Sequence, residues 1–133
     1  MGNKKILIVE DNSDVRLGYH ILFKVNHYDT LFAADPLSSL AEALNHRPDV
    51  IILDLGLTAG DGFRVLDQFK AASELQGIPI IVVSGADMHT VKARALASGA
   101  KAYLQKPAGN AELLAVVAEF VGESPEGAPA GLA

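Results

Sequence analysis

The chain has 133 residues, of which 50% are hydrophobic and 20% are charged, and it contains no cysteine. This composition predicts one folded domain, and the lack of thiols excludes a disulfide scaffold, a thiolate zinc site and a cysteine nucleophile. A net charge of −5 disfavours non-specific binding to nucleic acid. Because the apolar runs are only strand-length and residues 1–6 lack a signal-peptide core, we expect a cytoplasmic protein with no membrane partner.

Short apolar runs alternate with amphipathic segments in the first half of the chain. We expect a strand over residues 6–9, then a helix capped by Asn12 or Ser13. The broad apolar face of this helix is assigned to Val15, Gly18, Tyr19, Ile21, Leu22 and Val25. A weaker strand over residues 30–33 precedes a helix that begins at the Asp35 cap and ends near residues 47–48. Its apolar stripe is assigned to Leu37, Leu40, Ala41 and Leu44.

The same alternation continues to residue 121. Residues 50–53 and 78–83 are apolar on both faces, which is typical of strands covered by helices on both sides. Between them we expect a helix that begins near residues 61–62 and buries Phe63, Val65, Leu66 and Phe69. A helix that ends at Gly99, a strand over residues 102–104 and a last helix capped by Asn110 complete the series. Five βα units predict an α/β protein with a doubly wound, five-stranded parallel sheet and helices on both faces.

Polar residues follow four of the five predicted strands. Glu10 and Asp11 come after the first, Asp54 after the third, Ser84 after the fourth and Lys106 after the fifth. In the strand order 2-1-3-4-5 these ends lie side by side, at the edge where open α/β sheets bind ligands. Crowded carboxylates need a cation, and oxygen ligands without His or Cys favour Mg²⁺ over Ca²⁺. Because a hydroxyl and an ammonium suit phosphoryl oxygens, the sequence predicts phosphoryl transfer to or from an aspartate.

Four sequence motifs closely resemble the receiver domains of two-component response regulators. They are residues 5–12, residues 51–55 followed by 61–63, residues 82–85 and residues 103–107. The resemblance covers roughly residues 4–121, and the order and spacing of the four motifs make it specific. The resemblance implies a flavodoxin-like sheet of order 2-1-3-4-5. We therefore expect a receiver domain over residues 1–121 and a flexible Gly/Pro/Ala-rich tail or linker over residues 122–133.

The resemblance also implies roles for individual residues. Asp54 is expected to accept the phosphoryl group, Ser84 to bind a phosphoryl oxygen, and Lys106 to pair with the Asp54 carboxylate and then with the phosphate. Mg²⁺ is expected on Glu10, Asp11, Asp54 and the backbone carbonyl of Gly56. Tyr103 matches the aromatic residue that changes rotamer together with the Ser84 hydroxyl, and the peptide bond between Lys106 and Pro107 matches one that is cis in the family.

The implied function is a phosphorylation-dependent switch, a phosphoacceptor that catalyses its own phosphorylation and dephosphorylation and is not otherwise an enzyme. The expected phosphoryl donor is a histidine kinase or a histidine phosphotransfer protein, and the expected output is binding to a downstream protein. Because helix 88–97 lacks most of the acidic residues of a charge-paired dimer face, we expect a monomer or a weak dimer. The chain is either a stand-alone regulator or the receiver of a hybrid histidine kinase.

Two other functions stay open on the sequence. A metal-dependent aspartyl-phosphate phosphatase needs an acidic residue two positions after its nucleophile, and Gly56 in that position disfavours it. A pseudo-receiver that binds partners without phosphorylation is expected to lose an acidic or lysine position, and this chain keeps all of them. Thr58 stands where the family usually has proline, and Gly56 and Ala86 lack the polar side chains that relatives often carry.

Overall fold

The computed structural model describes residues 3–55, 59–85 and 88–122, and within them it contains one five-stranded parallel sheet. The strands are β1 (Lys5–Val9), β2 (Asp29–Ala33), β3 (Val50–Asp54), β4 (Ile80–Ser84) and β5 (Ala102–Gln105). Their order is β2-β1-β3-β4-β5, with every neighbouring pair parallel. The predicted doubly wound α/β fold and its strand order are therefore confirmed.

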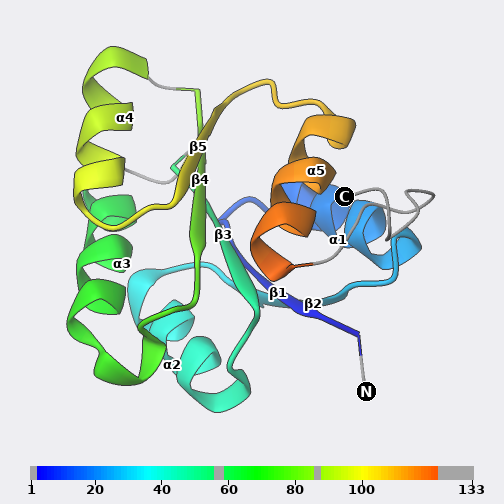
Figure 1. Ribbon diagram of the computed structural model, residues 1–133, viewed down its shortest axis with the longest axis horizontal. Coiled ribbons are helices and arrows are strands. Elements are labelled where there is room, and N and C mark those ends of the chain that lie inside the picture. The colour runs from blue at the N-terminus through cyan, green and yellow to red at the C-terminus, as the bar shows by residue number, and fades with distance from the viewer. Residues whose placement is uncertain (1–2, 56–58, 86–87, 123–133) are drawn as a thin grey trace.

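The helices cover both faces of this sheet. They are α1 (Ser13–Val25), α2 (Pro36–His46), α3 (Ala59–Ala71), α4 (Met88–Ala97) and α5 (Asn110–Val121), with a short 3₁₀ helix, η1 (Ser73–Leu75). Figure 1 shows α2, α3 and α4 on one side of the sheet and α1 and α5 on the other. Among the described residues, no helix is long and apolar enough to cross a membrane.

Alternate residues of each strand fill two separate cores. Leu7 and Val9 pack with the side chains of α2, α3 and α4, whereas Ile6 and Ile8 pack with those of α1 and α5. All five residues of β3 are buried. This alternation explains why the central strands read as unbroken apolar runs, because both of their faces are covered.

The apolar faces predicted for the first two helices were partly wrong. In α1, Ile21 and Val25 are 55% and 67% exposed, whereas Phe23 is fully buried. The geometry of the α-helix explains this, since Phe23 lies one turn after Tyr19 while Ile21 projects from the opposite side. In α2, Leu37 is 77% and Leu44 40% exposed, Ala41 is also exposed, and the fully buried residues are Ser39 and Ala43. Ser39 tolerates burial because its hydroxyl donates to the Pro36 carbonyl at 2.8 Å.

Several predicted boundaries also shift. Helix α3 begins at Ala59, two residues before the predicted start, and β4 begins at Ile80, after Pro79. Asn110 is the first residue of α5 and makes no side-chain cap; the capping position belongs to Gly109. By contrast, the predicted cap of α1 is confirmed, because Asn12 Oδ1 accepts from the backbone N–H groups of Asp14 and Val15 at 2.9 and 3.1 Å.

Candidate functional site

The carboxyl ends of the central strands carry buried polar residues. Among the described residues, four with polar or charged side chains are buried: Glu10, Ser39, Asp54 and Ser84. Three of them end or directly follow the neighbouring strands β1, β3 and β4. Since burying a carboxylate or hydroxyl costs free energy, this concentration at one edge of the sheet marks a site rather than a packing feature.

Asp54 is the centre of this group. It is the last residue of β3 and has no exposed surface. Lys106 Nζ lies 2.8 Å from Asp54 Oδ1, and the Tyr19 hydroxyl donates to Asp54 Oδ2 at 3.3 Å. Lys106 is held in place because its backbone N–H donates to the carbonyl of Ser84 at 2.8 Å. The peptide bond between Lys106 and Pro107 is cis, as predicted.

Glu10 and Asp11 lie beside Asp54 at the end of β1. Glu10 is 2% exposed, its Oε2 accepts from the backbone N–H of Asp11 at 3.1 Å, and its carbonyl accepts from Arg16 Nη1 at 2.8 Å. Burial, and after it the negative charge of Asp54, raises the pKa of Glu10 from 4.5 to about 7, against the opposing charge of Lys106. The charge of Lys106 therefore offsets only part of the negative charge at this edge, and a bound cation would offset more of it.

The donor chemistry of these residues fits a hard cation. Glu10, Asp11 and Asp54 offer only oxygen ligands, the type that Mg²⁺ prefers. In the part of the chain that the structure describes, no three His, Cys, Asp or Glu side chains converge closely enough to hold a metal by themselves. Mg²⁺ commonly takes one or two carboxylates and completes its shell with water, so the set is still compatible with it. Gly56, the predicted carbonyl ligand, lies outside the described residues, as do Thr58 and Ala86.

Ser84 and Tyr103 share one face of the sheet. Ser84 is two residues after Val82 on β4, and Tyr103 pairs with Val82 in the register of β4 and β5. Because side chains alternate along a strand, Val82, Ser84 and Tyr103 all project toward the side covered by α4. Ser84 is fully buried and Tyr103 is half-buried against the core of that side. The register therefore brings together the two residues of the predicted switch.

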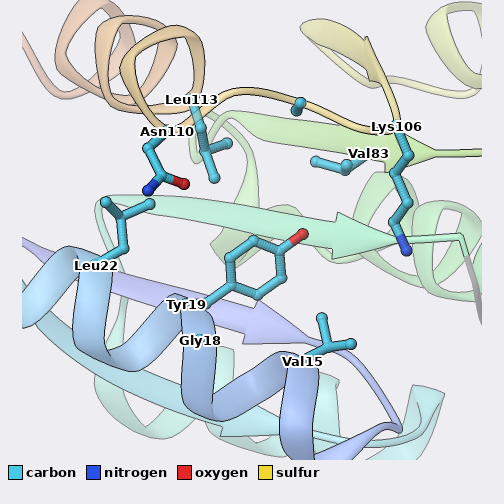
Figure 2. Close-up of a pocket in the computed structure, with 9 residues that line it drawn as sticks. Val15, Gly18, Tyr19, Leu22, Val83, Lys106, Asn110 and Leu113 are labelled. Carbon is cyan, nitrogen blue, oxygen red and sulfur yellow. The ribbon is translucent and has the colours of Figure 1, made fainter.

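Sequence reasoning missed two residues of the site. Tyr19 was placed on an apolar helix face, yet its hydroxyl reaches Asp54, and Arg16 holds the backbone after β1. A buried tyrosine usually finds a hydrogen-bond partner, so a tyrosine on the sheet-facing side of α1 was the available signal. Figure 2 shows the Tyr19 ring rising from α1 toward the sheet, while the Lys106 side chain extends from the opposite side of the pocket.

Comparison with known proteins agrees with this arrangement. Residues 6–118 match the response regulator receiver domain family. The chain is 30% identical over 121 residues to the polar-differentiation response regulator DivK of Brucella anthropi, an alignment that covers 91% of this chain and 98% of that protein.

Solved structures show the same fold. The chemotaxis protein CheY4 of Vibrio cholerae superposes with a TM-score of 0.82 at 27% identity and covers 90% of this chain and 99% of its own. The receiver domain of sensor histidine kinase PA1611 of Pseudomonas aeruginosa, whose structure has a magnesium ion coordinated in the active site cleft, gives a TM-score of 0.82 at 25% identity, over 92% of this chain and 100% of its own. This chain therefore belongs to the response regulator receiver domain family of two-component signalling.

Proposed function

We propose that Asp54 accepts a phosphoryl group from the phosphohistidine of a histidine kinase or a histidine phosphotransfer protein, in a reaction that requires Mg²⁺. The observation that carries this proposal is the complete burial of Asp54 at the end of β3 with Lys106 Nζ 2.8 Å from its Oδ1. A buried carboxylate beside a cation, at the edge of a parallel sheet where α/β proteins bind ligands, is an arrangement suited to phosphoryl transfer.

The proposed reaction is an in-line displacement at phosphorus. An oxygen of Asp54 attacks, the bond from phosphorus to the donor nitrogen breaks, and the imidazole of the donor leaves with the electron pair. Lys106 and the Ser84 hydroxyl would face the phosphoryl oxygens and offset their negative charge. Glu10, Asp11, Asp54 and the carbonyl of Gly56 would hold Mg²⁺, which supplies charge neutralisation when bound. Hydrolysis by water at the same phosphorus would return Asp54 to its free form.

The proposed output is a change of the surface formed by α4, β5 and α5. When Ser84 moves toward the phosphoryl group, Tyr103 can turn into the vacated space, because both project toward α4. This surface is small, since Ala95 of α4 is fully buried and the Arg94 guanidinium lies 3.8 Å from the centre of the Phe63 ring. Such a patch suits binding to another protein, and we expect a cytoplasmic protein that stays mostly monomeric in sedimentation experiments with beryllofluoride.

The domain assignment is part of the same proposal. We assign residues 1–121 to the receiver domain and residues 122–133 to a tail or linker; residues 123–133 lie outside the described part of the chain. A stand-alone regulator and the receiver of a larger protein share the same site, so the chemistry proposed for Asp54 applies to both.

Intact-mass measurement after incubation with a small acyl phosphate and Mg²⁺ tests the phosphoacceptor role. The wild type should gain one phosphate, and the gain should disappear when EDTA replaces Mg²⁺. Asp54→Asn should abolish the gain, whereas Asp11→Asn should mainly raise the Mg²⁺ concentration required. A wild type that gains nothing would instead favour a pseudo-receiver, and a phosphate retained in Asp54→Asn would place the acceptor elsewhere.

A further inference from the structure

Tyr19 contacts Asp54, and the function proposed above gives it no role. Its hydroxyl lies 3.3 Å from Asp54 Oδ2, while Lys106 occupies Oδ1 at 2.8 Å, so each carboxylate oxygen has its own partner. The Tyr19 ring stacks on Phe23 one turn further along α1, with 6.3 Å between centroids and 24° between planes. This stacking orients the ring so that its hydroxyl points away from the helix and toward the sheet (Figure 2).

The hydroxyl acts as the donor in this contact. An ionised carboxylate can only accept hydrogen bonds, so the proton must come from Tyr19. Burial, and then the charge of the neighbouring Asp54, raises the pKa of Tyr19 above its ordinary value. A tyrosine hydroxyl has an ordinary pKa of about 10, so Tyr19 is the donor of this hydrogen bond near neutral pH.

The strength of this hydrogen bond depends on the chemical form of Asp54. In the free carboxylate the negative charge is shared by both oxygens, and hydrogen bonds to charged acceptors are the stronger ones. In the acyl phosphate one oxygen bridges to phosphorus and the other is a neutral carbonyl oxygen, while the charge resides on the phosphoryl group. Whichever oxygen is phosphorylated, the bond from Tyr19 is weaker than before.

We propose that Tyr19 is a positioning residue whose hydroxyl biases Asp54 toward its unphosphorylated form. The inference rests on the proposed phosphoacceptor role of Asp54. By stabilising the free carboxylate, the hydroxyl slows attack of Asp54 on phosphorus. By the same interaction it assists hydrolysis, in which water attacks phosphorus, the bond from phosphorus to Asp54 breaks and the carboxylate departs with the electron pair. The hydroxyl remains protonated in both reactions.

The Tyr19 ring lines a cavity, so it is not enclosed by packed side chains on every side. The cavity has a volume of about 510 Å³ and lies between α1 and the beginning of α5. Besides Tyr19 it is lined by Val15, Gly18, Leu22, Val83, Lys106, Ala108, Asn110 and Leu113. Gly18 at the edge of this cavity is exposed to solvent, so the cavity is open to solvent along α1.

The test compares the rate of phosphorylation and the rate of hydrolysis in Tyr19→Phe with those in wild type. Phosphorylation is followed by intact mass with acetyl phosphate and saturating Mg²⁺, and decay is followed after the acetyl phosphate is removed. The ratio of the phosphorylation rate to the decay rate should rise about fivefold, as expected for the difference between a hydrogen bond to a charged acceptor and one to a neutral acceptor. Phosphorylation should be faster and decay slower; a general loss of structure would instead slow phosphorylation.

The matched control is Tyr28→Phe, which removes a hydroxyl from another tyrosine of the same core. Tyr28 contacts Phe23 edge-on at 6.0 Å but precedes β2, at the end of the sheet opposite to Asp54. The ratio of phosphorylation rate to decay rate in Tyr28→Phe should equal that of the wild type. Tyr19→Leu also lacks the hydroxyl and should shift the ratio of phosphorylation rate to decay rate in the same direction as Tyr19→Phe. It replaces Tyr19→Phe in the test if that variant is poorly folded.

The outcomes separate this inference from the proposed function. If wild type gains no phosphate at Asp54, the proposed function is wrong. If wild type is phosphorylated and the ratio in Tyr19→Phe stays within twofold of wild type, or falls below it, then only the role of Tyr19 is wrong. An equal shift in Tyr28→Phe would also overturn it, because the effect would not depend on contact with Asp54.

Discussion

Replacing Lys106 with Met should lower the free energy of unfolding, because Asp54 then stays buried without its cation. The substitution removes the ammonium 2.8 Å from Asp54 Oδ1 and keeps most of the apolar stem. Coulomb's law gives about 6 kcal/mol for this pair at an effective dielectric constant of about 20, and about 1.5 kcal/mol in bulk water. Because the Lys106 side chain is 34% exposed, solvent screens the pair. We therefore expect the free energy of unfolding to fall by about 2–3 kcal/mol.

Denaturant unfolding in EDTA checks this value in wild type, Lys106→Met, Asp54→Asn and the double variant. In the Asp54→Asn background, the loss of Lys106 should cost less than about 1 kcal/mol, because no buried carboxylate is left without its cation. The difference between the two backgrounds is the coupling energy of the pair. An equal cost in both backgrounds would refute the reasoning, since Lys106 would then stabilise the fold through packing alone.

Three other predictions concern the N-terminal cap of α1, the buried carboxyl group of Glu10 and the lifetime of the acyl phosphate. Asn12→Ala should lower the free energy of unfolding by about 1 kcal/mol, since it removes the cap of α1; an unchanged denaturation midpoint would contradict this. In metal-free buffer, the raised pKa of Glu10 should make the wild type lose stability as pH rises from 4.5 to about 7, by an amount on the order of 3 kcal/mol. Glu10→Gln should lack this loss in unfolding curves recorded at both pH values, and identical pH profiles would refute the assignment. Because neither Gly56 nor Ala86 carries a polar side chain that could orient water, the acyl phosphate should be long-lived for a receiver domain. The double variant Gly56→Asn, Ala86→Glu should lose phosphate faster, and equal decay rates would count against this.

The fold was predictable because its signals are local and repeated. Apolar runs too short for helices alternate with amphipathic segments, and only a parallel sheet covered on both faces accommodates that pattern. The burial of Asp54 at the end of a central strand was predictable for the same reason, since Asp54 directly follows such a run. The exposed leucines of α2 were not predictable, because hydropathy does not say that the small residues Ser39 and Ala43 face the core there.

The contact between Tyr19 and Asp54 was not predictable because it is a tertiary contact. It joins residues 35 positions apart and depends on how far α1 lies from the end of β3. Periodicity places Tyr19 on the sheet-facing side of α1 but does not reveal that its hydroxyl reaches a carboxylate. The ion pair between Lys106 and Asp54 was expected from the family resemblance and from the strand order, which places the ends of β3 and β5 at one edge.

The most direct test of the central claim is to identify the phosphorylated residue chemically. Borohydride reduces an aspartyl phosphate to homoserine, which marks the acceptor position permanently. After incubation with acetyl phosphate and Mg²⁺, reduction and peptide mass spectrometry, we predict homoserine at position 54 and no other converted carboxylate. Homoserine at position 11 instead, or no conversion in a protein that has gained a phosphate, would contradict the account.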